Sequence, residues 1–297
     1  MASAQLQAVK EVLVGIGRMA PDVPLDAQRA VVDALGSMRP PPDGVEVTPL
    51  GGEAPAGEWV SAQGADGRRV VLYLHGGGYC VGSAVSHRLL AAELSVSSGA
   101  RVLVLDYRRA PEHRFPAAFD DAVVAYHWLL GQGHDPAAIA VAGDSAGGGL
   151  TLAALVALRD GGLPLPGAGV CISPWGDVAG RAASLATHDD RDYVLSAAWL
   201  SAMAAHYLGD ADRADPRASP LAAELGGLPP LLVLVGSEEV LYDDALAVAE
   251  RARAAGVACE LEVFEDCAHW WMLAGAGTPE ATAGVERVGR FLRARLA

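Results

Sequence analysis

The chain has 297 residues, with 36 acidic side chains against 22 basic ones and a formal net charge of −14 at pH 7. This acidic balance argues against nucleic-acid binding, which needs clustered Lys and Arg, and Lys10 is the only lysine, so no GxxxxGK[ST] phosphate loop exists. The length suggests one large domain or two modest ones, and the 52% hydrophobic fraction is that of a globular protein.

Residues 1–39 are predicted to form two helices that are broken at Pro21 and Pro24. Residues 12–20 within this segment look like a strand followed by GxGxxA, the dinucleotide fingerprint. That fingerprint must open a helix whose N-terminus meets the pyrophosphate, and the two prolines follow too soon for such a helix. We therefore expect no dinucleotide and no other cofactor.

Short apolar runs then alternate with longer helical patterns, as in the βαβ units of a parallel sheet. The segment Ala146–Leu158 is apolar almost all round, which suits a helix buried against a sheet. The candidate strands are Val45–Leu50, Glu58–Ala62, Val70–Leu74, Val102–Asp106, Ile139–Gly143, Gly169–Ser173, Leu231–Gly236 and Glu260–Phe264.

Residues 178–222 interrupt this alternation because they are too long for a simple crossover between strands. They carry an amphipathic stretch that includes Trp199, Met203 and Tyr207. We expect this segment and residues 1–39 to lie over the sheet as helical pieces.

The sequence Gly143-Asp144-Ser145-Ala146-Gly147 matches GxSxG, the nucleophile elbow. It follows a predicted strand and opens a predicted buried helix, which is the context that the motif requires. The small neighbours let the flanking backbones approach while the serine sits on a sharp, strained turn. Ser145 is therefore the candidate nucleophile, and Asp144 beside it is expected to hold the loop by hydrogen bonds.

The sequence His75-Gly76-Gly77-Gly78 follows the strand Val70–Leu74. Glycines allow backbone N–H groups to point at a developing negative charge without intervening side chains, which is the requirement of an oxyanion hole. The alternative is a glycine-rich turn with His75 packing locally, but the order of this motif and GxSxG along the chain favours the oxyanion hole.

Together with Asp106-Tyr107-Arg108-Arg109-Ala110-Pro111, these motifs resemble the bacterial hormone-sensitive-lipase-like family of α/β-hydrolase esterases. The resemblance implies an α/β-hydrolase fold with a mostly parallel eight-stranded sheet flanked by helices, and a helical cap. Residues 1–39 and 178–222 would form the cap, and residues 40–177 and 223–297 the catalytic core. It also implies that Gly77, Gly78 and Ala146 supply the oxyanion N–H groups and that His75 shapes the loop.

In this fold the catalytic base comes last in the chain, after a final strand. His269 follows the strand Glu260–Phe264 and is the only histidine in that position. The acid belongs to the turn after Leu231–Gly236, where Glu239 occupies the position aligned with the aspartate of many relatives. Asp243, Glu238 and Asp244 are the alternatives, and only their reach to the histidine decides between them.

The expected function is hydrolysis of short- to medium-chain carboxylic esters through an acyl-serine intermediate, with Ser145, His269 and Glu239 as the triad. A lactonase, amidase or peptidase would use the same triad, and a non-catalytic ligand-binding protein would use the same scaffold. Trp199, Met203, Tyr207, Trp270 and Trp271 are candidate pocket walls, for which plain core packing is an equal alternative.

Other sequence features concern location and partners. The four cysteines are scattered with no CxxC pair, so we expect neither a disulfide framework nor a metal site. No signal-peptide pattern and no apolar run of 18 residues is visible, which favours a cytoplasmic protein without membrane insertion. The expected partner is a small-molecule ester, and the resemblance is compatible with a homodimer through the edge strand near Glu260–Phe264.

Overall fold

A computed structural model of the protein describes residues 2–273 and 277–297, over which the chain forms an eight-stranded sheet with the order β1-β2-β4-β3-β5-β6-β7-β8. Strands β3 to β8 pair in parallel, and β2 runs antiparallel to its neighbours β1 and β4. The strands are β1 (Val45–Pro49), β2 (Gly57–Ala62), β3 (Asp66–Leu74), β4 (Ala100–Leu105), β5 (Ile139–Asp144), β6 (Ala168–Ile172), β7 (Leu231–Gly236) and β8 (Cys259–Phe264).

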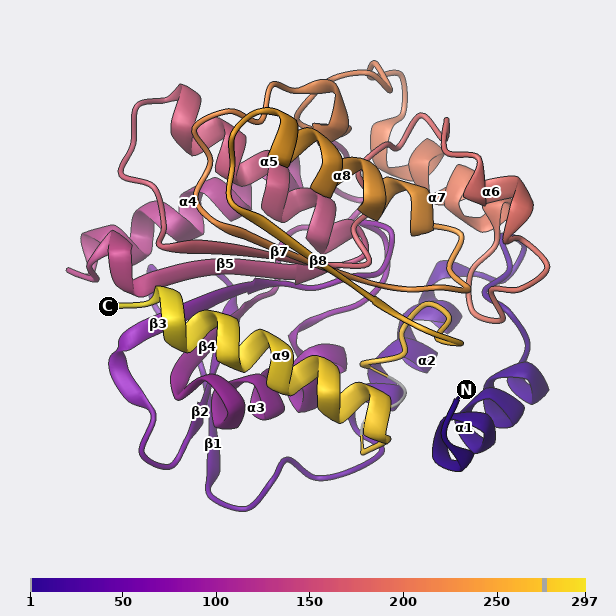
Figure 1. The fold of residues 1–297 in the computed structure, drawn as a ribbon, viewed down its shortest axis with the longest axis horizontal. Coiled ribbons are helices and arrows are strands. Elements are labelled where there is room, and N and C mark those ends of the chain that lie inside the picture. The colour runs from indigo at the N-terminus through magenta and orange to yellow at the C-terminus, as the bar shows by residue number, and fades with distance from the viewer. Residues whose placement is uncertain (1, 274–276) are drawn as a thin grey trace.

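Helices cover both faces of this sheet (Figure 1). Helices α4, α5 and α8 lie on one face, and α3 and α9 lie on the other. The helices are α1 (Ala4–Ile16), α2 (Leu25–Gly36), α3 (Ala84–Ser98), α4 (Ala117–Gly131), α5 (Ala146–Asp160), α6 (Ser184–Thr187), α7 (Ala197–Leu208), α8 (Tyr242–Ala254) and α9 (Pro279–Arg295), with 3₁₀ turns at Pro136–Ala138 and Pro220–Ala222.

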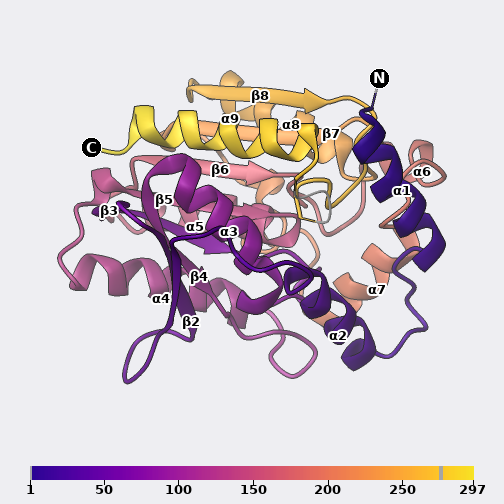
Figure 2. The same ribbon diagram turned by 90° about the horizontal axis from the view of Figure 1, so that it is seen from below.

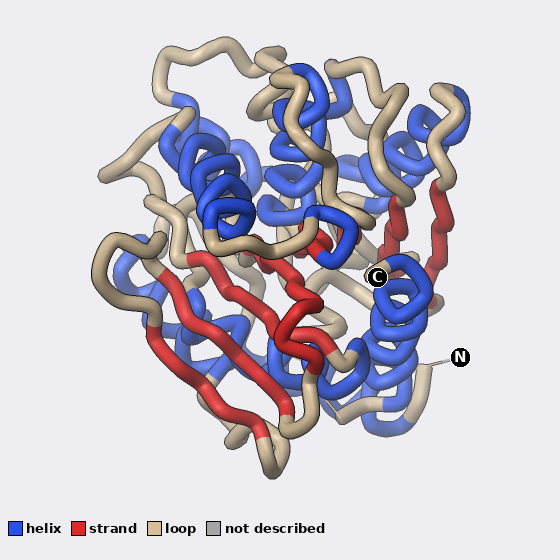
Figure 3. Tube along the Cα trace, turned by 90° about the vertical axis from the view of Figure 1, so that its left-hand side faces the viewer, coloured by secondary structure: helices blue, strands red, loops and turns tan. Residues whose placement is uncertain are grey.

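The central strands are the most completely buried part of the protein. Every residue of β5, β6 and β7 is buried, whereas the edge strands β1 and β8 are partly exposed. Strands covered on both faces read as continuous apolar runs, which is why the sequence located them well. The strands turn steadily relative to one another from one edge of the sheet to the other (Figure 3).

The predicted strands are all found, with small differences at their ends. The largest concerns β3, which begins at Asp66 rather than Val70 because Asp66 pairs with Ala100 of β4. This extension is polar, so an apolar pattern cannot detect it. Residues 12–16 belong to helix α1, so the GxGxxA sequence lacks the preceding strand that a dinucleotide site requires.

Helices α1, α2, α6 and α7 gather at the end of the molecule toward which β8 points (Figure 2). Specific bonds join residues 1–39 to residues 178–222. The Met19 N–H donates to the Val194 carbonyl at 2.9 Å, and Trp199 Nε1 donates to Gln28 Oε1 at 2.7 Å. The two segments therefore contact each other, and their division from the rest as a cap stays a prediction.

Candidate active site

Ser145 stands on a strained turn between β5 and α5. Its backbone has φ 55° and ψ −123°, which is unusual for any residue other than glycine. Ser145 is only 2% exposed to solvent. The turn requires glycine on both sides. A Cβ on Gly147 would meet the Leu74 carbonyl, and a Cβ on Gly143 would meet the Gly147 carbonyl. The spacing of GxSxG thus follows from backbone contacts in this structure.

Two glycine N–H groups lie free in the loop after β3. Gly77 and Gly78 have φ of +115° and +59°, and among the described residues neither N–H has a hydrogen-bond acceptor. A Cβ on Gly77 would meet the Val81 carbonyl, so this loop also depends on glycine. Ala146 is the first residue of α5, where a helix leaves its N–H unpaired.

Asp144 connects this glycine loop to the turn that carries Ser145. Its Oδ1 accepts from the Gly76 N–H at 3.0 Å and from the Tyr73 hydroxyl at 2.9 Å, and His87 Nε2 lies 3.1 Å from the same oxygen. Burial acts to raise the pKa of Asp144, but His87 and Tyr73 outweigh it, so the pKa is lowered and the carboxylate stays ionised. The prediction that Asp144 holds the loop is confirmed.

His75 packs inside the protein as a neutral ring. It stacks on Tyr107 with ring centroids 4.0 Å apart, and the Tyr107 hydroxyl donates to the His75 carbonyl at 2.7 Å. Burial and the neighbouring His87 lower the pKa of His75 to about 3. A ring in this position supports the loop that carries Gly77 and Gly78, which is the role that the family resemblance implied for it.

His269 and Glu239 form a buried hydrogen-bonded pair. The Nδ1 atom of His269 lies 2.7 Å from Glu239 Oε2, and the two residues are 2% and 0% exposed. The other ring nitrogen, Nε2, is buried without a hydrogen-bond partner among the described residues. Because an ionised carboxylate can only accept, Nδ1 carries the hydrogen and Nε2 is the free basic atom.

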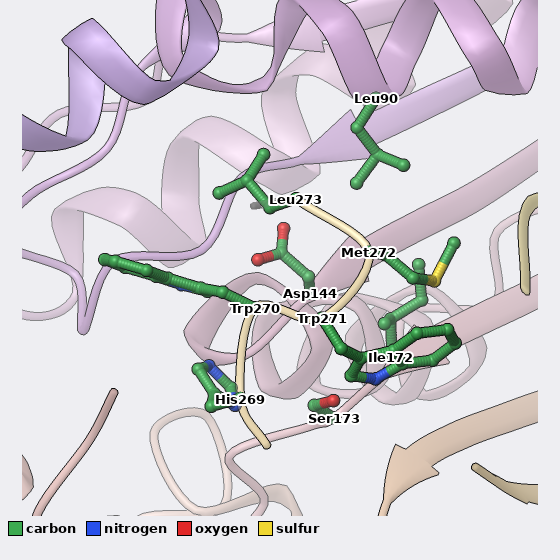
Figure 4. Close-up of a pocket in the computed structure, with 9 residues that line it drawn as sticks. All are labelled: Leu90, Asp144, Ile172, Ser173, His269, Trp270, Trp271, Met272 and Leu273. Atoms are coloured by element: carbon green, nitrogen blue, oxygen red, sulfur yellow. The ribbon is translucent and has the colours of Figure 1, made fainter. Parts of the chain in front are cut away.

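Glu239 is held from its other side by two donors. Its Oε1 accepts from the Ser173 hydroxyl at 2.6 Å and from the Gly236 N–H at 2.7 Å. Ser173 follows β6 with a φ of +47°, and Figure 4 shows its side chain beside His269. Sequence analysis missed Ser173, because only its left-handed backbone after a buried strand, which a sequence does not reveal, marks it as special.

The other carboxylates of the Glu239 turn have different partners. Asp243 accepts from the Ser184 N–H at 2.8 Å, and Asp244 accepts from the Gly176 and Asp177 N–H groups. Glu238 accepts from the hydroxyl of Ser237 beside it. Among the described residues of this turn, Glu239 is the acid that contacts His269.

The pKa of His269 results from opposing effects. Burial lowers it, but the charge and hydrogen bond of Glu239, with further contributions from Asp192 and Asp144, outweigh the burial. The net pKa lies above the ordinary value of 6.5. The imidazole is therefore a stronger base than a free histidine, as general-base catalysis near neutral pH requires.

The candidate pocket walls divide into two groups. Trp199 and Met203 of α7 lie over the glycine loop, since a Cβ on Gly78 would be 2.8 Å from Met203 Cγ and 2.9 Å from the Trp199 ring. Trp271 stacks on Phe264 with centroids 4.2 Å apart, and together with Trp270 it lines a small cavity beside His269 (Figure 4). A cavity of about 10 Å³ remains beside His269, enough for about one water molecule.

Trp270 points away from Trp271 toward the N-terminal helices (Figure 4). It lines a narrow apolar groove of about 30 Å³ together with Leu13, Ile16, Met19, Val31, Tyr193 and Val194. The Lys10 ammonium of α1 lies 5.3 Å from the centre of the Tyr193 ring, so α1 packs along this groove.

The described residues contain no cluster of three or more His, Cys, Asp or Glu side chains that could hold a metal ion. None of the helices in this part of the chain is long and apolar enough to cross a membrane.

Comparison with known proteins agrees with this geometry. A family profile described as alpha/beta hydrolase fold matches residues 71–273. The chain belongs to the α/β-hydrolase family. An acetyl-hydrolase of Streptomyces hygroscopicus is 46% identical to this chain, and the match covers 99% of this chain and 97% of the relative. An ethyl acetate hydrolase of Pseudomonas putida is 39% identical, and the match covers 76% of this chain and 73% of the relative.

A solved esterase from the bacterial hormone-sensitive lipase family superposes with a TM-score of 0.96 and 43% identity, over 100% of both chains. The predicted resemblance to this family and the predicted eight-stranded α/β-hydrolase fold are confirmed. The prediction of a carboxylic ester hydrolase is confirmed at the level of reaction class.

Proposed function

We propose that this α/β-hydrolase cleaves short- to medium-chain acyl esters by means of Ser145, His269 and Glu239. One observation carries the proposal: the buried His269 keeps Nδ1 bonded to Glu239 and leaves Nε2 without a partner among the described residues. That is the tautomer that a serine hydrolase needs.

In the first half of the reaction, the Ser145 oxygen attacks the ester carbonyl carbon while His269 Nε2 takes its proton. The carbonyl oxygen becomes an anion that accepts from the N–H groups of Gly77, Gly78 and Ala146. The bond from carbon to the alcohol oxygen then breaks, and the alcohol leaves with the proton from His269.

In the second half, water attacks the acyl-serine ester and gives its proton to the same Nε2 atom. The bond from carbon to Ser145 breaks, the serine recovers the proton, and the carboxylic acid leaves. Glu239 stays ionised throughout and stabilises the imidazolium that forms in each half.

The preference for short acyl groups rests on two findings. The relatives include proteins named acetyl-hydrolase and ethyl acetate hydrolase. In addition, Trp199 and Met203 leave little room over Gly78, because they lie within contact distance of a Cβ placed there. Substrates with long, rigid acyl groups would need these side chains to move.

The test combines p-nitrophenyl esters of increasing chain length with labelling by a fluorophosphonate. The wild type should hydrolyse the acetate and butyrate esters faster than the decanoate and should bind the label covalently. Ser145→Ala should lose both properties and keep its thermal unfolding midpoint to within a few degrees. Unchanged hydrolysis by this variant would refute the proposal.

We further propose a cytoplasmic protein that forms a homodimer through β8, the strand at one edge of the sheet. An edge strand offers unpaired N–H and C=O groups to a second copy. Light scattering coupled to gel filtration should give twice the mass of one chain, and the mass of a single chain would refute the dimer.

A further inference from the structure

Val240 directly follows Glu239, and both its N–H and its carbonyl form hydrogen bonds with side chains of the segment 178–222. The Val240 N–H donates to Asp192 Oδ2 at 3.1 Å, and the Val240 carbonyl accepts from the Ser184 hydroxyl at 2.8 Å. Both partners are buried and come from 48 and 56 residues away along the chain. The peptide that follows the triad acid is thus fixed by a part of the protein outside the sheet.

Asp192 is a carboxylate in an unusual position. It is 1% exposed, and its Oδ1 accepts from the N–H groups of Val194 and Leu195 at 3.0 Å each. No arginine or lysine pairs with it among the described residues, and all of its hydrogen bonds within that part of the chain come from backbone N–H donors. Burial of a carboxylate without a cationic side-chain partner costs folding free energy, which the hydrogen bonds only partly offset.

Three carboxylates act on the His269 ring. Glu239 contacts it directly, and the charges of Asp192 and Asp144 act from farther away, each raising the pKa of His269. Burial in turn raises the pKa of Asp192, and His269 opposes that rise. Asp192 therefore has an electrostatic relation to the catalytic histidine as well as a mechanical one to Val240.

The loop that carries Asp192 is also bonded to the N-terminal segment. The Val194 carbonyl accepts from the Met19 N–H, and the Leu195 carbonyl accepts from Arg18 Nε at 3.0 Å. The loop 192–195 is thus held from both sides, by residues 18–19 and by the turn after β7.

We propose that Asp192 is a positioning residue, which fixes the Glu239 turn through Val240 and adds a further negative charge for the His269 imidazolium. Ser184 completes the positioning by holding the Val240 carbonyl. The proposal rests on the roles given above to Glu239 and His269. It makes the segment 178–222 a part of the catalytic apparatus in addition to a wall of the pocket.

Asp192→Asn is the principal test, because the amide keeps the size of the side chain but removes its charge and sets an NH₂ group against backbone N–H donors. For p-nitrophenyl acetate we expect kcat to fall roughly 10- to 100-fold with little change in KM, since a misplacement of catalytic groups by about 1 Å can cost about 10²-fold. The acidic limb of the kcat/KM profile should move to lower pH, because His269 loses one of the charges that raise its pKa.

Two variants separate the electrostatic part from the mechanical part. Ser184→Ala removes the bond to the Val240 carbonyl without a change of charge, so kcat should fall while the acidic limb stays in place. Asp177→Asn is the control for loss of a buried carboxylate away from His269, because Asp177 is also buried and accepts two backbone N–H bonds, from Ala179 and Arg181, although it also pairs with the Arg181 side chain. This control variant should lower the thermal unfolding midpoint and leave the acidic limb of the kcat/KM profile at the same pH.

The pKa of His269 should also be measured by NMR titration, which needs no turnover. If wild type does not hydrolyse esters, the proposed function fails, but a lower His269 pKa in Asp192→Asn would still support the role of Asp192. An unchanged limb and an unchanged titration in folded Asp192→Asn would overturn the proposal. If that variant does not fold, wild-type kcat in folded Ser184→Ala would overturn it instead.

Discussion

Replacement of Glu239 by glutamine tests the candidate triad most directly, because the structure determines how the new amide must orient. The oxygen at the Oε1 position accepts from two donors, Ser173 Oγ and the Gly236 N–H, whereas within residues 2–273 and 277–297 Oε2 accepts only from His269. The amide oxygen will therefore take the Oε1 position, because the opposite orientation would point an NH₂ group at the Gly236 N–H.

In that orientation the NH₂ group of the glutamine faces His269 Nδ1. The ring must then accept at Nδ1 and carry its hydrogen on Nε2, the atom that should take the proton of Ser145. In serine proteases the corresponding change enforces this wrong tautomer and lowers kcat about 10⁴-fold, or roughly 5 kcal/mol of barrier. We expect a loss of this order for Glu239→Gln, with KM little changed because Glu239 is fully buried.

The assay is steady-state hydrolysis of p-nitrophenyl acetate, with thermal unfolding to confirm that each variant is folded. Asp243→Asn is the control, because it removes one negative charge four residues after Glu239 and leaves His269 and Glu239 paired. A loss of kcat that is larger in Asp243→Asn than in Glu239→Gln would refute the assignment of the acid. So would a Glu239→Gln enzyme with activity within tenfold of wild type.

Further predictions concern the base and the two glycine turns. In a pH-rate profile of the wild type, kcat/KM should rise with pH, and the midpoint of this rise should lie above pH 6.5, because Nε2 of His269 must be neutral and the pKa of His269 is raised. A midpoint well below pH 6.5 would contradict this. Gly78→Ala should lower kcat about 10²-fold by displacing an oxyanion donor, and adding Met203→Ala should restore part of the loss, which kinetics of the single and double variants will check. Gly147→Ala should destabilise the protein by about 3 kcal/mol in urea unfolding, the upper end of the usual cost of overpacking, since its Cβ has no room beside the Leu74 carbonyl.

Much of the site could be predicted because its parts are local. Ser145 and Gly78 lie in turns whose backbones demand glycine at set spacings, and the sequence displays those spacings directly. His269 could be located because it follows the last strand of a fold with a known chain order. The buried strands β5 and β7 were predicted to within a residue, since sheets covered on both faces need uninterrupted apolar runs.

The residues that hold the acid could not be found in this way. Ser173 contacts Glu239 across 66 residues, and Asp192 contacts Val240 across 48, with no local pattern at either end. Their importance lies in side-chain directions that emerge only when β6, β7 and the segment 178–222 are packed. The choice of Glu239 over Asp243 depended on the same three-dimensional information, which is why sequence alone left both open.

The contact between Lys10 and Tyr193 offers a practical means to follow how α1 packs against the loop that carries Tyr193. Since Lys10 is the only lysine, an amine-directed fluorophore would mark a single side chain, apart from the terminal amine of the chain. Lys10 belongs to α1 and contacts the ring of Tyr193, which lines the same groove as Trp270. The emission of the fluorophore would therefore report whether α1 separates from the loop when an ester binds. The single lysine therefore allows a site-specific label at the contact between α1 and the loop that carries Tyr193.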